Sequence, residues 1–272
     1  MAESLFDNLR DISMKKVSKT LLLCLLASMF YLLPLGAMAE DKPGSLAEVW
    51  LVTVKNGYLG NFQEALKKHT AVRLEHGDPW KWQVYTTVVG TDLNQIAIRY
   101  CCVNWTDVDS YEQWNRSNPD VTSHWFEVVG PHVEKLEHYF QQIDWKNSHW
   151  NEDADSSRLY GVTEWTIKGG SDADFSIALE KMSQIAIDQG WATAERNWAW
   201  SERIGGRDTQ SLVIPYKNYA AMQPGEESFY AFLAKHMGSE EAAGELFKKF
   251  SGAAWGSEYT VWEHRPDLSM SK

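Results

Sequence analysis

The chain of 272 residues repeats its own sequence, and this repeat limits the possible folds more than any other feature. Two segments align without a gap at an offset of 113 residues. The matched residues include Val54, Phe62, Ala65, Leu66 and Gly77 in the first segment, and Ile167, Phe175, Ala178, Leu179 and Gly190 in the second. Such a repeat marks a structural unit that is formed more than once. We therefore predict two similar halves in tandem.

Each half shows the same succession of hydrophobic patterns. An alternating stretch predicts a half-buried strand, and apolar residues at helical spacing follow it until Gly77 or Gly190, where a helix would end. Two strand-like stretches, a second helical region and a last strand complete the unit. These strands are predicted at 82–89, 95–103 and 139–145 in the first half and at 194–200, 211–216 and 259–264 in the second. The order β-α-β-β-α-β predicts an α+β protein with two ferredoxin-like halves.

A ferredoxin-like sheet has helices on one face only, so its other face needs cover. The simplest cover is the equivalent face of the other half, which gives a closed barrel with the helices outside. A tandem chain can form this barrel within one molecule. We predict the junction at 156–160, directly after the polar run at 151–155, so we expect the halves to span residues 40–155 and 156–272.

The first residues have the pattern of an export signal. Lys15, Lys16 and Lys19 precede an apolar run at 21–35, and an Ala-Met-Ala sequence at 37–39 follows it. The run is shorter than the ~20 residues that a membrane span needs. We predict a signal peptide at 1–39, with Met14 as an alternative start, and an exported protein, periplasmic or secreted. An uncleaved N-terminal anchor is the alternative.

Charge and composition narrow the class of partner. The chain has 26 basic and 37 acidic residues, a net charge of −11, which argues against a nucleic-acid partner because phosphates attract clustered Lys and Arg. Tryptophan is unusually frequent, with 14 residues. Its large apolar face suits both cores and flat ligand sites.

After signal cleavage only two cysteines remain, Cys101 and Cys102. Neighbouring residues in a strand point to opposite faces, so we expect two buried thiols, with a redox pair or an intermolecular bridge as alternatives.

The repeated β-α-β-β-α-β pattern across residues 46–266 resembles the dimeric α/β-barrel superfamily. This superfamily includes stress-responsive barrel proteins, NIPSNAP-like proteins and antibiotic-biosynthesis or haem-degrading monooxygenases. The resemblance implies the fold and a substrate site between the sheet and the helices. It implies no particular activity, because the fold hosts many.

One candidate site follows the third strand of the first half, where Trp105 and His124 lie in a segment similar to the monooxygenase-like pattern. The resemblance implies that Trp105 forms a pocket wall and that His124 reaches into the pocket, with Arg99 beside them. Trp114 stands where such proteins often have histidine, and the second half lacks the first tryptophan. Core packing for Trp105 and a solvated histidine are the alternatives.

A second candidate site lies in the second half. Alternation places Arg196, Trp198 and Trp200 on one strand face, where they could clamp a planar anionic ligand. A packing ladder without a ligand is the alternative. Glu164 stands where the first half has Leu51, which suggests a local polar pocket, with Arg196 or Arg99 as the partner of this carboxylate.

No metal site is predicted, because none of the eight histidines shows the spacing of paired ligands on one helix face. Haem remains possible as a cofactor, since one histidine can ligate its iron.

The leading functional hypothesis is an exported binding or sensing protein that holds a small apolar or aromatic molecule in a tryptophan-rich pocket. The alternatives are a cofactor-poor or haem-related monooxygenase-like enzyme and a non-catalytic interaction scaffold. A homo-oligomer is possible with any of these.

Overall fold

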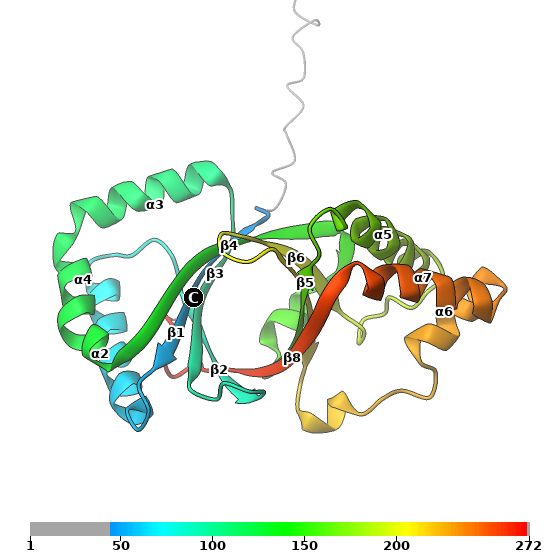
Figure 1. Cartoon of the computed structure of the whole chain (residues 1–272). Coiled ribbons are helices and arrows are strands. Elements are labelled where there is room, and N and C mark those ends of the chain that lie inside the picture. The colour runs from blue at the N-terminus through cyan, green and yellow to red at the C-terminus, as the bar shows by residue number, and fades with distance from the viewer. Residues whose placement is uncertain (1–43, 271–272) are drawn as a thin grey trace, which may run out of the picture. The chain divides into compact units, whose positions relative to one another are not determined.

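The computed structural model describes residues 44–270, in which eight strands close into a barrel (Figure 1). The predicted signal peptide lies outside the described residues. No helix within 44–270 is long and apolar enough to cross a membrane. The predicted junction at 156–160 lies between the end of a short 3-10 helix, η5 (Glu152–Ser156), and the start of the strand β5 (Leu159–Ile167).

Each half has the predicted order of strands and helices. The first half contains β1 (Leu46–Val54), α2 (Leu59–Glu75), β2 (Gln83–Val89), β3 (Gln95–Val103), α3 (Trp105–Ser117), α4 (Pro119–His124), the short π-helix η3 (Trp125–Val129), the 3-10 helix η4 (Gly130–His132), and β4 (Val133–His149). The second half contains β5 (Leu159–Ile167), α5 (Asp172–Asp188), β6 (Trp198–Ile204), β7 (Thr209–Tyr216), η6 (Tyr219–Met222), α6 (Phe229–Met237), α7 (Glu240–Gly252) and β8 (Ala254–His264). The α+β prediction of two ferredoxin-like halves is confirmed.

The barrel closes because the two sheets pair at both edges. The strand order is β1-β3-β2-β8-β5-β7-β6-β4, so the halves meet where β2 pairs with β8 and where β4 pairs with β6. The long strand β4 makes its contact by continuing past β1 to pair with β6. The prediction of an intramolecular barrel is therefore confirmed, and α2–α4 and α5–α7 cover opposite sides of it (Figure 1).

Glycines end the first helix of each half. Gly77 has φ +68° and Gly190 has φ +83°, a left-handed conformation that glycine adopts without a steric penalty. In the first half the chain reverses at once, because the amide of Asp78 donates to the carbonyl oxygen of Arg73 at 3.0 Å. This turn places the Asp78 side chain beside the end of α2.

One predicted strand differs in position. The strand expected at 194–200 begins only at Trp198, because the amide of Arg196 donates to the carbonyl oxygen of Thr193 and forms a turn.

Cys101 and Cys102 form a disulfide across a cis peptide bond, and both are half-buried. The expectation of two buried thiols is wrong, since it assumed the side-chain alternation of a regular strand.

The C-terminal segment crosses to the first half and completes its core. After β8, the amide of Arg265 donates to the carbonyl oxygen of Val84 at 2.8 Å, and the amide of Met270 donates to that of Trp82 at 2.9 Å. Leu268 and Met270 are only 1% and 2% exposed, and both pack in the core between the first sheet and its helices. The second half thus supplies part of the first half's interior.

We expect Leu268→Ala to lower the free energy of unfolding by about 2–5 kcal/mol, because it leaves a cavity in a packed core. Urea denaturation followed by circular dichroism measures the change. Ile177→Ala is the control, since this α5 side chain is mostly exposed and its loss should change stability by about 0.5 kcal/mol or less. Equal small effects of both substitutions would show that the C-terminal segment does not pack in the core.

Candidate functional site

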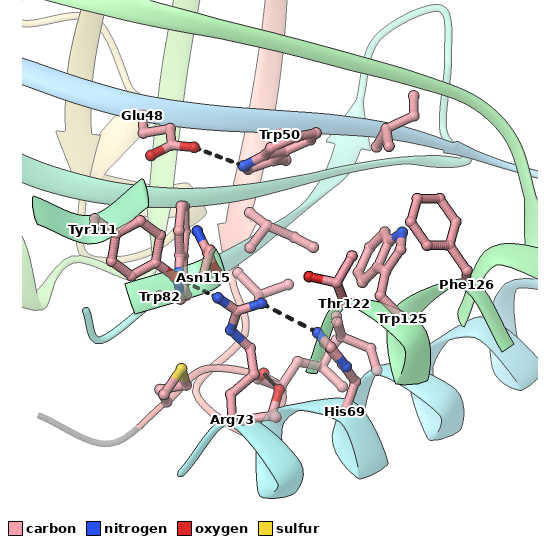
Figure 2. Close-up of a pocket in the computed structure, with 17 residues that line it drawn as sticks. Glu48, Trp50, His69, Arg73, Trp82, Tyr111, Asn115, Thr122, Trp125 and Phe126 are labelled. Carbon is pink, nitrogen blue, oxygen red and sulfur yellow. Dashed lines mark hydrogen bonds between the residues drawn. The ribbon is translucent and has the colours of Figure 1, made fainter. Parts of the chain in front are cut away.

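A cavity of about 290 Å³ lies between the first sheet and the helices that cover it (Figure 2). Its walls are mostly aromatic and aliphatic, and they come from strands, from helices and from the C-terminal segment. The aromatic members are Trp50, Trp82, Tyr111, Trp125 and Phe126. Phe126 is 66% exposed and stands at the mouth, whereas Trp82 is buried. The cavity is therefore a largely apolar pocket with one open side.

A buried group of polar side chains forms one end of the cavity. The Nε of Arg73 donates to Oδ2 of Asp78 at 2.6 Å, and its Nη2 donates to the hydroxyl of Tyr111. The same hydroxyl accepts a hydrogen bond from Nε1 of Trp82 at 2.8 Å and donates to Oδ2 of Asp78 at 3.1 Å. Because Asp78 is buried, the ion pair is shielded from water and fixes the guanidinium against the cavity.

Local sequence explains how this cluster forms. His69 and Arg73 are four residues apart on α2, which places both on one helix face. Asp78 follows the turn at Gly77, and Tyr111 is the buried residue of α3. Burial raises the pKa of the Tyr111 hydroxyl far above its ordinary value, while the charge of Arg73 partly offsets this effect. The phenol therefore stays protonated and can keep donating to Asp78.

His69 is a neutral imidazole. It is 2% exposed, and burial, followed by the charges of Arg73 and His124, lowers its pKa from 6.5 to about 3. Its Nε2 lies 3.3 Å from Nη1 of Arg73, and its Nδ1 lies 3.2 Å from Nδ1 of His124. A protonated ring next to the guanidinium would repel it, so the neutral form is the stable one.

A carboxylate occupies the wall opposite Arg73 (Figure 2). Glu48 is 5% exposed, and its Oε1 accepts hydrogen bonds from Nε1 of Trp50 and from Nε2 of His138, each at 2.9 Å. The rings of Trp50 and His138 stack with their centroids 4.0 Å apart, as expected for directly paired residues of β1 and β4. This arrangement holds a buried acidic group at the cavity wall.

Two polar side chains of the cavity are free to bind a ligand. Asn115 lies one helical turn after Tyr111 on α3, and Thr122 lies on α4 near the mouth. Neither side chain has a hydrogen-bond partner among residues 44–270. A hydroxyl or carbonyl group of a ligand could form a hydrogen bond with the Asn115 amide, so that both polar groups would have a partner.

These residues do not fit haem. The only imidazole that lines the cavity belongs to His69, and both of its ring nitrogens already face partners, so neither is free to ligate iron. The adjacent guanidinium would also oppose a cationic metal centre. Within the described part of the chain no group of three or more His, Cys, Asp or Glu side chains could hold a metal ion.

The structure places the residues predicted for the first site in different surroundings. His124 does not line the cavity, but it contacts His69, which does. Trp105 is the first residue of α3, is 51% exposed, and packs on Phe140 with ring centroids 5.1 Å apart. Arg99 lies on the inner face of the barrel, on the other side of the sheet. The three residues therefore do not share one pocket.

The residues predicted for the second site are also separated. Trp198 and Trp200 are buried in the core of the second half, where Nε1 of Trp198 donates to the carbonyl oxygen of Asn147. Arg196 precedes the strand and stacks on Trp191, with Cζ 4.1 Å from the ring centroid. This pair matches the packing alternative rather than a clamp, because the strand alternation begins only at Trp198.

Glu164 lies on the inner face of the barrel and bonds the hydroxyl of Ser211 at 3.3 Å. It has no ion pair with Arg196 or Arg99. Burial raises the pKa of the Glu164 carboxyl, and the nearby charge of Arg203 partly offsets the rise.

Sequence reasoning missed four residues of this site: Glu48, Arg73 and Tyr111, which line the cavity, and Asp78, which pairs with Arg73. One signal was present, because Glu48 interrupts the apolar face of β1 that carries Trp50, Val52 and Val54. An acidic residue on that face needs a buried partner. The other three come from separate elements, and only the folded chain brings them together.

Comparisons with known proteins reveal the fold but no close relative. No family model and no curated protein matches the chain. A candidate monooxygenase from Fusobacterium nucleatum is 10% identical, with 84% of this chain and 94% of that chain covered and a TM-score of 0.51. The chain has the dimeric α/β-barrel fold.

Other solved structures match more weakly. An anthrone oxidase-like protein is 9% identical, with 83% and 92% of the two chains covered and a TM-score of 0.49. A mutant chlorite dismutase from Candidatus Nitrospira defluvii is 9% identical, with 84% and 95% covered and a TM-score of 0.45. At such low identity these likenesses concern the arrangement of the chain and not its chemistry.

The low pKa of His69 predicts a pH-dependent stability. Below pH 6.5 the unfolded chain binds a proton at this residue and the folded chain does not, so the folded state loses stability as the pH falls from 6.5 towards about 3. The slope from this residue approaches about 1.4 kcal/mol per pH unit. Urea denaturation between about pH 4.5 and 7 should show a flatter slope for His69→Gln. The exposed His76→Gln is the control, and identical slopes in both variants would contradict a buried neutral His69.

Proposed function

We propose that this protein binds a small, planar, mainly apolar molecule that carries one hydroxyl or carbonyl group, in the cavity of its first half. The observation that carries the proposal is an aromatic-walled cavity with free and fixed polar groups at one end. Such pockets, with a few oriented polar groups, are the usual form of small-molecule sites.

The volume limits the size of the ligand. About 290 Å³ lies at the lower end of the ~300–1000 Å³ that is common for small-molecule sites. A molecule of two fused aromatic rings suits this space. Trp50 on the sheet and Trp125 on the helical side offer flat apolar surfaces to such rings (Figure 2).

The polar end favours a neutral ligand over an ion. The charge of Arg73 is already balanced by Asp78, and Glu48 adds a carboxylate on the opposite wall. A second anion would meet that carboxylate in a site of low polarity, where like charges repel strongly. A neutral hydroxyl can instead bond the Asn115 amide without a charge penalty.

The proposal places this binding outside the cytoplasm. The charged, apolar and Ala-Met-Ala segments before residue 40 support export with cleavage of the leader. Sequencing the N-terminus of the protein recovered from its native host tests this part. A mature chain that still begins at Met1 or Met14 would contradict cleavage.

Isothermal titration with 1-naphthol and naphthalene tests the site. We expect 1-naphthol to bind more tightly, because only it offers a hydroxyl to Asn115. Thr122→Trp places an indole at the mouth and should abolish binding of both compounds. The control Ile177→Trp adds the same group on exposed α5 and should change neither affinity. Binding that survives Thr122→Trp would place the ligand elsewhere.

Asn115→Leu separates the polar contact from the cavity itself. It keeps a similar side-chain volume, and the amide that it removes bonds nothing among the described residues. Naphthalene should still bind, while the preference for 1-naphthol should fall by about fivefold to tenfold, as expected for one neutral hydrogen bond. Failure of both compounds to bind the unaltered protein would overturn the proposed function and favour an interaction scaffold.

A second candidate function is that of a cofactor-independent, monooxygenase-like enzyme, and the buried carboxylate of Glu48 supports it. A base at the cavity wall could accept the hydroxyl proton of a bound aromatic, and the resulting anion would be a better electron donor to oxygen. Oxygen uptake with 1-naphthol tests this candidate. Oxygen uptake that is lost in Glu48→Gln would favour an enzyme. Binding of 1-naphthol without oxygen uptake would favour a binding protein.

A further inference from the structure

The inner face of the barrel carries a second group of polar side chains, separate from the cavity. Arg99 of β3 pairs directly with Val49 of β1, which in turn pairs directly with Tyr139 of β4. Directly paired residues share a face of the sheet. Tyr85 of β2 pairs with Ala97, two residues before Arg99, so it points to the same side. The cavity residue Trp50 alternates with Val49 and faces the helices.

Water reaches this inner face. Leu51 and Ala97 pair in the middle of β1 and β3 and point into the closed barrel, yet both are half-buried rather than fully buried. Arg99, Tyr85 and Glu164 are also only half-buried. An eight-stranded barrel is wide enough either to be filled by side chains or to hold one small ligand. Because residues in the middle of the strands are partly exposed, a barrel interior that can hold a small ligand is favoured over one that is filled by side chains.

The two arginines of the interior differ in their partners. Arg203 is occupied: its Nη2 donates to Glu137 at 2.9 Å, its Nε donates to the carbonyl oxygen of Gly205, and its Cζ lies 3.7 Å from the ring centroid of Tyr139. Arg99 makes no hydrogen bond or ion pair with any described residue. A half-buried guanidinium without an anion has five donors available for a ligand.

Two tyrosine hydroxyls near Arg99 are free as well. Neither Tyr85 nor Tyr139 forms a hydrogen bond through its hydroxyl within residues 44–270. Burial raises the pKa of both hydroxyls. Acidic side chains add to the rise, Asp155 for Tyr85 and Glu164 for Tyr139, and the charge of Arg99 partly offsets it in both. Tyr160 packs edge-on against Tyr85, with ring centroids 5.4 Å apart, and adds an apolar wall.

We propose that the barrel interior is a second binding site, in which Arg99 and the hydroxyls of Tyr85 and Tyr139 bind the carboxylate of a small organic acid. A guanidinium suits a carboxylate because it can form two parallel hydrogen bonds, and the phenols add donors on its flank. The aromatic and aliphatic side chains around these groups suit an apolar body behind the carboxylate. This site lies on the opposite side of the sheet from the cavity and goes beyond the proposed function.

The interior also carries three acidic side chains that a bound anion would meet, namely Glu137, Glu164 and Glu258, and Glu258 pairs directly with Glu164. Glu137 is neutralised by Arg203. Burial raises the pKa of the Glu164 carboxyl, and the nearby charge of Arg203 partly offsets the rise.

Isothermal titration with benzoate and with its neutral analogue benzamide tests the proposal. Benzoate should bind the full chain and benzamide should not. Arg99→Gln should weaken benzoate binding by about tenfold or more, because it removes a charged partner. Arg196→Gln is the matched control, since this arginine stacks on Trp191 outside the barrel, and it should leave the affinity unchanged.

A second pair of variants distinguishes the two sites. Thr122→Trp, which closes the cavity, should leave benzoate binding intact, whereas Ala97→Phe, which fills the barrel interior, should abolish it. Melting temperatures of all variants report whether each one folds. Absence of benzoate binding to the unaltered protein, equal affinity in Arg99→Gln, or loss of binding in Thr122→Trp would each overturn the proposal without bearing on the naphthol site.

Discussion

Edge-to-edge pairing of the two sheets is the interaction on which the rest of this structure depends. Each ferredoxin-like sheet alone would expose a bare face and two open edges, which is unfavourable in water. The contacts of β2 with β8 and of β4 with β6 remove all four edges together. They also fix the orientation of the two inner faces, so that polar groups from both halves meet in one interior. The helical faces then remain available for two independent cores.

The two cores differ in how they are packed. The second is filled by aromatic side chains such as Trp200, Phe175 and Phe250, which pack with ring centroids 4.4 to 6.4 Å apart. The first keeps a cavity in the corresponding place, and a buried ion pair of Arg73 and Asp78 stands at its end. A buried ion pair contributes little net stability compared with apolar packing.

The fold could be predicted because it depends on patterns that are local in the sequence. The alternation of apolar and polar residues predicted β3 with its observed ends, and Gly77 and Gly190 predicted the turns after α2 and α5. The cavity could not be predicted in the same way. Arg73 and Asp78 are near neighbours, but Tyr111 and Glu48 reach them from α3 and β1, and no spacing rule connects such residues. The prediction for Trp105 failed because this residue starts a helix and its side chain points outward. Tertiary packing decides that direction, and the sequence pattern does not show it.

The C-terminal segment has a consequence for how the two halves can evolve and be engineered. Leu268 and Met270 pack in the core of the first half and also line its cavity, so the segment after β8 forms part of a wall whose other residues belong to the first repeat. A gene fragment that encodes only the first repeat would lack this wall, and a circular permutant cut between the halves would retain it. A protein fused directly after Met270 would sit beside the cavity. The tandem arrangement therefore makes ligand binding a property of the complete chain, although the binding residues belong mostly to one repeat.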